Sequence, residues 1–520
     1  MDTTLGSASS PGSKVRPGWV LAAVMLASLM QVIDVTIAAV AIPEMQGNLS
    51  ASPDQISWVL TSYIISTAIM TPAVGWLSGR IGRRRLFFLS VSGFTLASLA
   101  CGQASSLDEL VVWRVFQGAL GAPLVPLSQA TLLDVYPRWR HGFAMGIWSL
   151  GLMLGPMIGP ALGGYITEVH GWPWIFYINL PLGLLAFLGI QAFVPDSERQ
   201  PRPFDFLGFA SLSLSVASFQ VMLDRGELLD WFSSTEIMIE AGISGACFYV
   251  FIVHALTTKH PFVDLKLFRD RNFAVGMWFV FMFGLLLLTG IALMPLFLQN
   301  LLDFPVTVSG NVLVPRGAGA MAAMVVTARL LDQVDGRWLM GTGLILMAYA
   351  MWEQSYFTID VSFFTIGWVG VLQGFGLGLV FVPINTLTFV TLSPQHRTEA
   401  AGMFNLVRNA GASIGVSIVI SQLIRNTQIN HEELAGHITP FNEMLRAPFL
   451  PEAWQLSDTA GLLALNDEIT RQANIIAYAN DFKLLMVIAL INIPILLFFR
   501  LPTKSLEVTD MASTENFRTG

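Results

Sequence analysis

The chain has 520 residues, of which 54% are hydrophobic and only 12% are charged. About 25% of the residues of a soluble protein are charged, so this composition excludes an ordinary soluble globular protein. Apolar stretches recur from end to end, and each is long enough to cross a hydrocarbon core about 30 Å thick. The sequence therefore predicts an all-α polytopic membrane protein. Its two cysteines, Cys101 and Cys247, both lie in apolar stretches, which argues against a disulfide framework and a cysteine metal site.

Fourteen apolar segments are predicted to span the membrane, with polar loops between them. They cover residues 18–43, 55–77, 86–104, 108–133, 142–166, 174–194, 205–223, 237–257, 272–299, 309–331, 338–357, 362–390, 399–424 and 481–500. Because the number of spans is even, both ends of the chain are expected on the same side of the membrane.

Basic residues are distributed unevenly between the loops. The loops on one side carry Lys14, Arg16, Arg80, Arg83, Arg84, Arg85, Arg138, Arg140, Arg199, Arg202, Lys259, Lys266, Arg269, Arg271, Arg337, Arg397 and Lys504. The short loops on the other side carry almost none, with Arg225 as the exception. By the positive-inside rule, this asymmetry places the polar tails 1–17 and 501–520 in the cytoplasm.

The chain contains a weak internal repeat. The segment GWLSGRIGRRRL at 75–86 resembles ARLLDQVDGRWL at 328–339, and RVFQGALGAPLVPLSQATL at 114–132 resembles VLQGFGLGLVFVPINTLTF at 371–389. The repeat predicts an N-terminal six-helix half at 18–194 and a C-terminal half at 272–500, with two extra helices at 205–257 between them. In such folds the substrate binds near the midplane, where the repeats meet.

The polar stretch 425–480 is far longer than the other outer loops. Part of it, ALNDEITRQANIIAYAN, has the apolar period of a helix. We interpret the stretch as a small extracytoplasmic subdomain with two helices, because long loops in compact proteins often carry function. An inert surface loop is the alternative.

Small residues and prolines are concentrated in the fifth predicted span. The residues concerned are Gly151, Gly155, Pro156, Gly159, Pro160, Gly163 and Gly164. Glycines spaced four residues apart form one smooth stripe on which another helix can lie closely. The prolines each remove a backbone hydrogen bond and favour a bend. The span is therefore either a joint between two moving bundles or only a tight packing face.

Four segments resemble motifs of the major facilitator superfamily. GWLSGRIGRRR resembles the superfamily's loop between spans two and three, and LVVWRVFQGALGA resembles its span-four motif with a buried arginine. The glycine–proline run of the fifth span resembles the antiporter motif, and QVIDVTIAAVAIP resembles the signature of the fourteen-span drug/proton antiporters. The resemblance covers essentially the whole chain. It implies two six-helix halves with two additional central transmembrane helices.

A narrower resemblance, to the EmrB type of exporter, rests on QVMLDRGELLDWFSS at 220–234 and on the long final outer loop. It implies a multidrug efflux pump of the bacterial inner membrane that is driven by the proton gradient and needs no other cofactor. It also implies work with a periplasmic adaptor of EmrA type and an outer-membrane channel of TolC type.

The loop motif is expected to control the conformational change. Its matching residues are Gly75, Arg80, Gly82, Arg83 and Arg84. Where the superfamily usually has an acidic residue in this loop, the chain has Gly79, so no proton role is assigned there. The second copy of the loop keeps an acid, Asp332.

Asp34 is the best candidate for the proton carrier. It lies about 22 Å along the first span from Trp19, at 1.5 Å per residue. Ionisable groups inside a membrane usually face a cavity and mark an ion or substrate path. Arg114 cannot release its proton, but it is the obvious partner for the Asp34 carboxylate. A static ion pair that fixes helix packing is the alternative.

Other polar residues inside the spans are candidates to line a substrate cavity. They are Gln31, Gln117, Gln129, Asn385, Asn405, Arg408 and Glu353. Arg408 could hold an anionic substrate group or stabilise the C-terminal half, and Glu353 is a minor candidate because it lies close to an outer end. The 22 Met, 36 Phe and 14 Trp supply soft and aromatic side chains that suit promiscuous binding of hydrophobic compounds.

No enzyme signature, ATP-binding loop or metal motif is present in the sequence. An exporter without an ATP site must use an ion gradient, and a buried aspartate suits protons. Two other functions stay open at this point. One is a dedicated exporter of a single amphiphile, such as a fatty acid or a siderophore, and the other is a membrane sensor that transports nothing.

Overall fold

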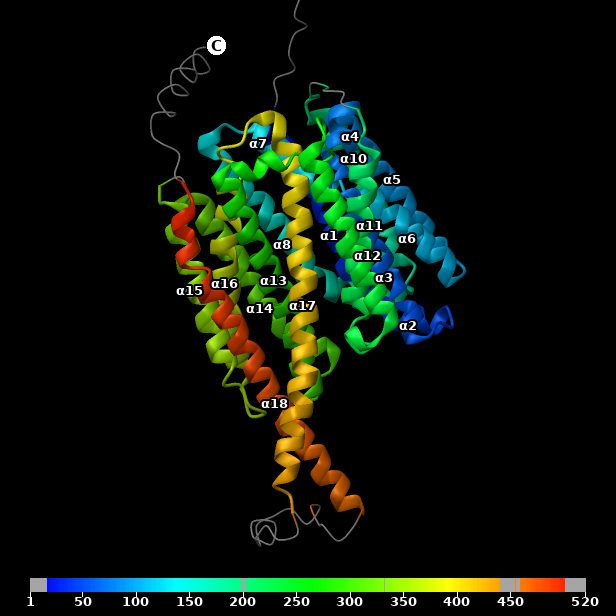
Figure 1. The fold of residues 1–520 in the computed structure, drawn as a ribbon, viewed down its shortest axis with the longest axis vertical. Coiled ribbons are helices and arrows are strands. Elements are labelled where there is room, and N and C mark those ends of the chain that lie inside the picture. The colour runs from blue at the N-terminus through cyan, green and yellow to red at the C-terminus, as the bar shows by residue number, and fades with distance from the viewer. Residues whose placement is uncertain are drawn as a thin grey trace, which may run out of the picture.

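The computed structural model describes residues 16–197, 199, 203–331, 333–439, 454 and 459–500. Every regular element in this part of the chain is a helix. Most of the helices run along the long axis of one bundle (Figure 1). The predicted tails, apart from Arg16 and Pro17, and the acid Asp332 lie outside the described residues.

The N-terminal half contains ten helices among the described residues. They are α1 (Pro17–Asn48), α2 (Pro53–Ile56), α3 (Trp58–Met70), α4 (Ala73–Ile81), α5 (Arg83–Gln103), α6 (Leu107–Gly121), α7 (Leu124–Val135), α8 (His141–His170), α9 (Trp174–Tyr177) and α10 (Asn179–Phe193). Prolines explain two interruptions, because a proline cannot donate the backbone hydrogen bond that would continue a helix. Pro72 separates α3 from α4, which meet at 59°, and Pro123 separates α6 from α7.

The extra pair of helices consists of α11 (Phe206–Arg225) and α12 (Thr235–Thr257). Thr61 on α3 donates a hydrogen bond to Asp224 on α11, which attaches the pair to the N-terminal half. The loop after α11 reaches the other half, because Trp231 Nε1 donates to Ser421 Oγ at 2.8 Å. The extra pair is therefore bonded to both halves.

The C-terminal half consists of α13 (Arg271–Asn300), α14 (Val306–Leu330), α15 (Gly336–Gln354), α16 (Phe363–Leu387), α17 (Arg397–Gly436) and α18 (Thr459–Ile491). Short 3-10 helices occur at Arg138–Arg140, Trp231–Ser233, Leu265–Arg269, Pro394–His396 and Pro494–Phe498. Among the described helices, twelve are long and apolar enough to cross a membrane, or thirteen if α3 and α4 form one bent span. α15 falls outside this set by the same criterion.

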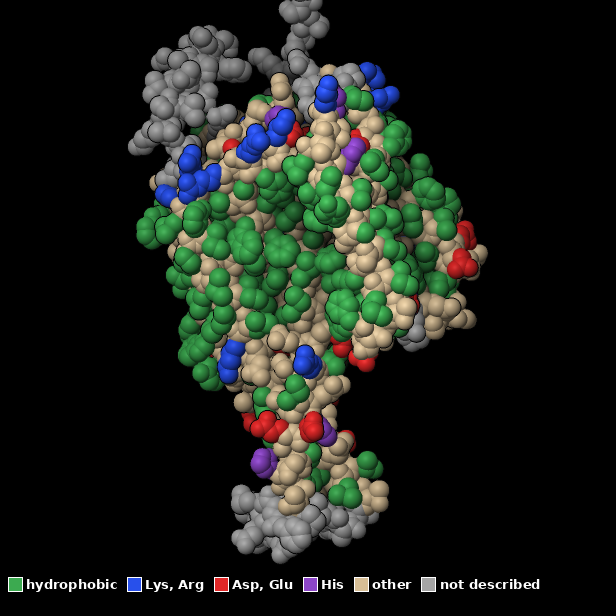
Figure 2. All heavy atoms as spheres, in the orientation of Figure 1, with side chains coloured by type: hydrophobic (Ala, Val, Ile, Leu, Met, Phe, Trp, Pro, Cys, Tyr) green, Lys and Arg blue, Asp and Glu red, His purple; other side chains and the backbone are tan. Residues whose placement is uncertain are grey.

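The two ends of the bundle differ in charge. Lys and Arg side chains gather at the upper end in Figure 2, next to a broad hydrophobic band around the middle. We call this the basic end. The junction of α4 and α5 lies there (Figure 1), and it contains Arg80, Arg83, Arg84 and Arg85. The opposite end is marked by α17 and α18, which project beyond the other helices (Figure 1), and we call it the hairpin end.

The two helices of this projection extend well beyond the last two predicted spans. The sequence predicts that they cover 399–424 and 481–500, with a separate subdomain at 425–480. Instead, α17 continues to Gly436 and α18 begins at Thr459, so both helices run directly out of the bundle. Thr427 Oγ1 donates to Asn474 Oδ1 at 2.9 Å, which ties the two projecting arms together. The two helices expected in this stretch are extensions of the spans, and residues 440–453 lie outside the described part.

Candidate functional site

A buried ion pair lies inside the N-terminal half. Arg114 Nη1 on α6 donates to Asp34 Oδ2 on α1 at 2.7 Å, and the two residues are 0% and 2% exposed. Two side-chain amides donate to the other carboxylate oxygen, Gln117 at 2.8 Å and Asn179 at 2.7 Å. The Asp34 carboxylate thus accepts three hydrogen bonds from two other elements of the bundle.

The Arg114 guanidinium has anchors that do not depend on Asp34. Its Nε donates to the Val59 carbonyl oxygen on α3 at 2.9 Å, and its Nη1 also donates to Gln117 Oε1 at 2.9 Å. The guanidinium carbon lies 4.3 Å from the centre of the Tyr63 ring, in cation–π contact. If the Asp34 carboxylate takes up a proton, Arg114 therefore keeps acceptors in place.

The glycine stripe of α8 packs against α1, the helix that carries Asp34. A Cβ atom on Gly155 would lie 2.5 Å from Val32, and one on Gly159 would lie 2.1 Å from the Thr36 hydroxyl. Thr36 Oγ1 also donates to the Gly155 carbonyl oxygen at 3.3 Å. Gly151 and Gly163 continue the same contact, and α8 stays one helix through Pro156. The stripe thus holds the backbone of α8 against the backbone of α1 at residues just before and just after Asp34.

We expect Gly155→Ala to lower the melting temperature of the purified protein, because the added methyl group overlaps Val32. Overpacking of this kind costs about 1–3 kcal/mol. Gly164→Ala is the matched control, since the nearest atom to its new Cβ would be 4.0 Å away. Equal melting temperatures for the two variants would show that α1 and α8 are not held closely together here.

A second charged cluster joins the two halves at the basic end. Asp134, at the end of α7, accepts from Arg83 Nη1 at 2.5 Å and from Arg397 Nη1 at 2.7 Å. Arg397 begins α17 and also donates to the Leu133 carbonyl oxygen at 2.5 Å. Arg83 Nη2 donates to Thr398 Oγ1 at 3.1 Å. We call these bonds around Asp134 the latch, because they hold α7 and α5 to α17.

The glycines of the loop motif shape the same region. A Cβ on Gly75 would lie 2.9 Å from the Glu399 Cα, so only glycine lets α4 lie this close to α17. Gly82 has φ +90°, a conformation that favours glycine, and it turns the chain from α4 into α5. Arg80 stacks on Trp76, and Arg84 donates to the Gln191 carbonyl oxygen. The motif thus positions the basic residues around the latch.

Three predicted cavity residues form a buried amide cluster between the halves. Gln129 Nε2 on α7 donates to Asn385 Oδ1 on α16 at 2.8 Å. Asn405 Nδ2 on α17 donates to Gln129 Oε1 at 3.4 Å. Instead of lining an open cavity, these amides are buried and bonded to one another. They add a second set of bonds between the halves below the latch.

The other predicted cavity residues lie apart from this cluster. Gln117 belongs to the Asp34 site, and Gln31 lies one helical turn before Asp34. Arg408 is half-buried on α17. Glu353 accepts from Tyr349 Oη at 2.7 Å at the end of α15, far from the ion pair in the chain's other half.

The structure also has a cleft of about 500 Å³ at the basic end. Asp134, Lys259 and Glu399 contribute to its lining. None of the predicted cavity residues lines this cleft.

Several residues of these clusters are absent from the sequence-based predictions. Asn179 is a polar residue inside a predicted apolar span, and so is Arg316, which the structure buries on α14. Asp134 and Arg397 lie just outside predicted spans, so their pairing across the halves depends on the tertiary fold. Asp481 is buried on α18, although the sequence places it at a span's edge. An inspection of every polar residue in the spans would have found Asn179 and Arg316.

Comparisons with known proteins agree on one family. The sequence model of the Major Facilitator Superfamily matches residues 24–416. The Multidrug export protein EmrB of Haemophilus influenzae is 35% identical over 484 residues, which cover 92% of this chain and 95% of that protein. The Fatty acid resistance protein FarB of Neisseria gonorrhoeae is 33% identical over 491 residues, or 94% of this chain and 97% of that protein.

A solved structure shares the fold at low sequence identity. The human organic anion transporter MFSD10 (TETRAN) aligns with a TM-score of 0.59 and 15% identity, covering 92% of this chain and 99% of that one. The all-helical bundle, the family match and the long alignments to exporters confirm a multi-pass integral membrane transporter rather than an enzyme. The chain belongs to the major facilitator superfamily, as a multidrug efflux transporter of the EmrB type.

Proposed function

We propose that the protein exchanges drugs for protons, exporting hydrophobic compounds across the bacterial inner membrane at the expense of the proton gradient and without another cofactor. The observation that supports this most strongly is the Asp34 carboxylate, buried in the bundle and bonded to Arg114. Ionisable residues in such positions usually mark an ion or substrate path. The proposal is tested by adding a drug to inverted membrane vesicles and measuring whether an imposed proton gradient collapses.

In this proposal Asp34 carries the proton and Arg114 holds the ionised carboxylate. Protonation removes the charge that Arg114 attracts, so it weakens a bond between α1 and α6. The neighbouring Asn179 amide links the same carboxylate to α10. A change of charge on Asp34 therefore alters contacts among three helices of one half. Rocking of that half against the other would then alternate access to a midplane site.

We propose fourteen spans, with both chain termini in the cytoplasm. This count includes α15, whose 19 residues are about 28 Å long at 1.5 Å per residue. That length is close to the thickness of a hydrocarbon core of about 30 Å. The concentration of Lys and Arg at the basic end (Figure 2) supports a cytoplasmic position for that end.

The hairpin end is proposed to dock a periplasmic adaptor of EmrA type, which would connect the transporter to an outer-membrane channel of TolC type. The arms of α17 and α18 project past the other helices and keep apolar side chains exposed, among them Ile429, Leu462 and Leu463. Exposed apolar patches often mark protein interaction sites.

Deletion of residues 432–474 is expected to abolish drug resistance in cells while leaving drug transport by the purified protein in vesicles. The two cut ends lie close together, because Asn430 Nδ2 donates to the Ala473 carbonyl oxygen at 3.4 Å. A short glycine linker can therefore join them without moving the spans. Vesicle transport by the full-length protein is the control. Loss of transport in vesicles by a folded deletion variant would contradict the docking role.

A second candidate function is the export of one amphiphile such as a fatty acid. Similarity to the Fatty acid resistance protein FarB favours it. A panel of unrelated lipophilic drugs separates the two functions in the vesicle assay, since a dedicated exporter would respond to one amphiphile and to none of the drugs.

A further inference from the structure

Arg316 is a buried cation without a counter-ion. It lies on α14, and the residue is only 5% exposed. Its one hydrogen bond is a long contact of 3.4 Å from Nη2 to the Leu287 carbonyl oxygen on α13. Its Nε and Nη1 are buried without a hydrogen-bond partner, and no described carboxylate oxygen lies within 4.0 Å of its nitrogens. Arg114, in contrast, donates hydrogen bonds to a carboxylate and to two further acceptors.

An arginine side chain does not lose its proton in a protein, so the buried positive charge of Arg316 remains. A buried charge is tolerated when it is paired or bonded to several polar groups, and the described residues supply only one weak acceptor here. The missing acceptors therefore come from outside the described residues, and a buried cation favours an anion among them. We propose that Arg316 binds the anionic group of a lipophilic substrate, a proposal that rests on the export function above and names a substrate class for it.

The surroundings of Arg316 keep its guanidinium at the centre of the C-terminal half. The residue lies about 15 Å along α14 from its first residue, near the middle of a 25-residue helix. A Cβ on Gly290 of α13 would lie 3.0 Å from Nη2, so glycine at this position lets the guanidinium approach α13. Gly374 brings the α16 backbone against the backbone of Arg316 itself. The charge is thus held between three helices at mid-depth.

Arg316 is also close to the boundary between the halves. A Cβ on the next residue, Gly317, would lie 2.8 Å from Met157 of α8 in the other half. When the halves separate at this level, the turn of α14 that carries Arg316 loses its cover. In the proposed transport cycle, this opening is the route by which a ligand reaches the guanidinium.

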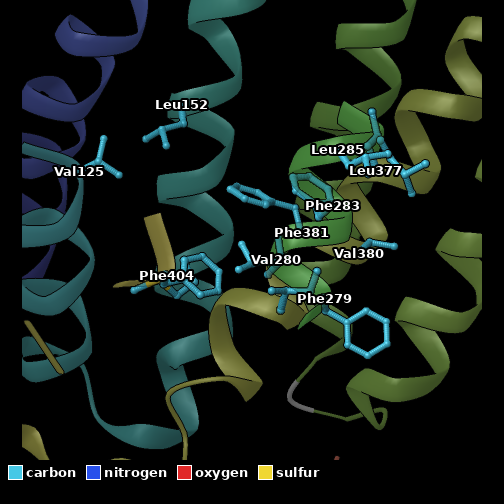
Figure 3. Close-up of a cluster of buried hydrophobic side chains, with 14 of the residues drawn as sticks. Val125, Leu152, Phe279, Val280, Phe283, Leu285, Leu377, Val380, Phe381 and Phe404 are labelled. Atoms are coloured by element: carbon cyan, nitrogen blue, oxygen red, sulfur yellow. The ribbon is translucent and has the colours of Figure 1, made fainter. Parts of the chain in front are cut away.

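An apolar cluster lies about two helical turns along α13 from this charge, because the guanidinium lies against Gly290. Phe283, seven residues before Gly290 on α13, stacks on Phe381 with ring centres 4.9 Å apart. Figure 3 shows these rings in a buried hydrophobic cluster that also contains Val125 and Leu152 from the N-terminal half. A cation about 10 Å from an apolar cluster suits a ligand with one anionic group and an apolar body of similar length, such as a medium-chain carboxylate. The same cation disfavours lipophilic cations.

The test compares decanoate with decan-1-ol, which has the same chain length but no charge. Purified full-length protein is titrated at pH 8 with each compound, below the micelle-forming concentration of decanoate and the solubility limit of decan-1-ol. We expect wild type to bind decanoate at least about tenfold more tightly than decan-1-ol, as charge-assisted hydrogen bonds are strong. Arg316→Gln is expected to remove this preference, and Arg316→Lys, which keeps the charge, is expected to retain part of it.

Equal decanoate binding by wild type and a folded Arg316→Gln variant would overturn the site. If that variant does not fold, the wild type still decides, because decanoate must then raise its melting temperature more than decan-1-ol does. Transport of a neutral lipophilic dye, Nile red, separates this proposal from the export function, because an uncharged compound neither needs nor is repelled by Arg316. Wild type that exports the dye but shows no decanoate preference refutes the anion site alone, whereas wild type that neither exports the dye nor prefers decanoate refutes both.

Discussion

Asp34→Asn is expected to abolish drug-dependent proton release from inverted membrane vesicles. The asparagine amide has nearly the same shape as the carboxylate, but it cannot take up and release a proton as the Asp34 carboxylate does. The substitution also leaves a buried guanidinium without its counter-ion, and removal of one partner from a buried pair costs about 3–5 kcal/mol. We expect a smaller loss here, because Arg114 keeps the Val59 and Gln117 acceptors.

Two further variants separate proton carriage from stability. Asp34→Asn combined with Arg114→Gln removes the orphaned charge, so we expect its melting temperature to recover while proton release stays absent. Glu353→Gln is the control carboxylate, since Glu353 is bonded only to Tyr349 at the end of α15. Proton release by Asp34→Asn at the wild-type rate, at matched expression, would mean that the pair is purely structural.

Asp134→Asn is expected to open the basic end. The substitution removes the negative charge that Arg83 and Arg397 share across the halves. Asp134 is 28% exposed on its side chain, so we expect a loss of about 1–2 kcal/mol, less than for a fully buried pair. A change of that size shifts the ratio of closed to open states by about 5–30-fold. Drug export should fall because the closed state forms less often.

The opening can be measured as a distance between spin labels. Arg85 on α5 and Gln395 before α17 are exposed at the basic end, and they belong to different halves. Labels at these two positions, in a background with both native cysteines replaced, should move apart in Asp134→Asn. Glu236→Gln is the matched control. Glu236 forms an exposed ion pair with Arg225 inside the extra pair of helices, so its loss should leave the distance between the labels unchanged. An unchanged distance in Asp134→Asn would exclude the latch.

The helical architecture follows from the sequence because each span must satisfy its own backbone hydrogen bonds in the membrane. Each of the fourteen predicted segments overlaps a described helix or helix pair. The predicted spans 399–424 and 481–500 are shorter than α17 and α18, because apolarity marks where a helix meets lipid and not where it ends. The polar arms of α17 and α18 remain helical through contacts with each other, such as the one between Thr427 and Asn474.

The candidate site is only partly visible in the sequence. Asp34 and Arg114 stand out because a charge inside an apolar span is rare, and the structure places them in contact. The latch does not stand out, because Asp134, Arg83 and Arg397 lie in polar loops or at helix ends, where charges are common. Their convergence depends on how two halves hundreds of residues apart pack together. Burial of Arg316 without a partner is likewise a property of the packing.

The length of α17 has a mechanical consequence. One unbroken helix of 40 residues, about 60 Å long at 1.5 Å per residue, connects Arg397 in the latch to the outer tip at Gly436. Because this helix is unbroken, a tilt of a few degrees at the basic end displaces the tip by several ångströms. A protein bound to that tip would therefore be displaced by each conformational change at the latch, and no other element would be needed to transmit the movement.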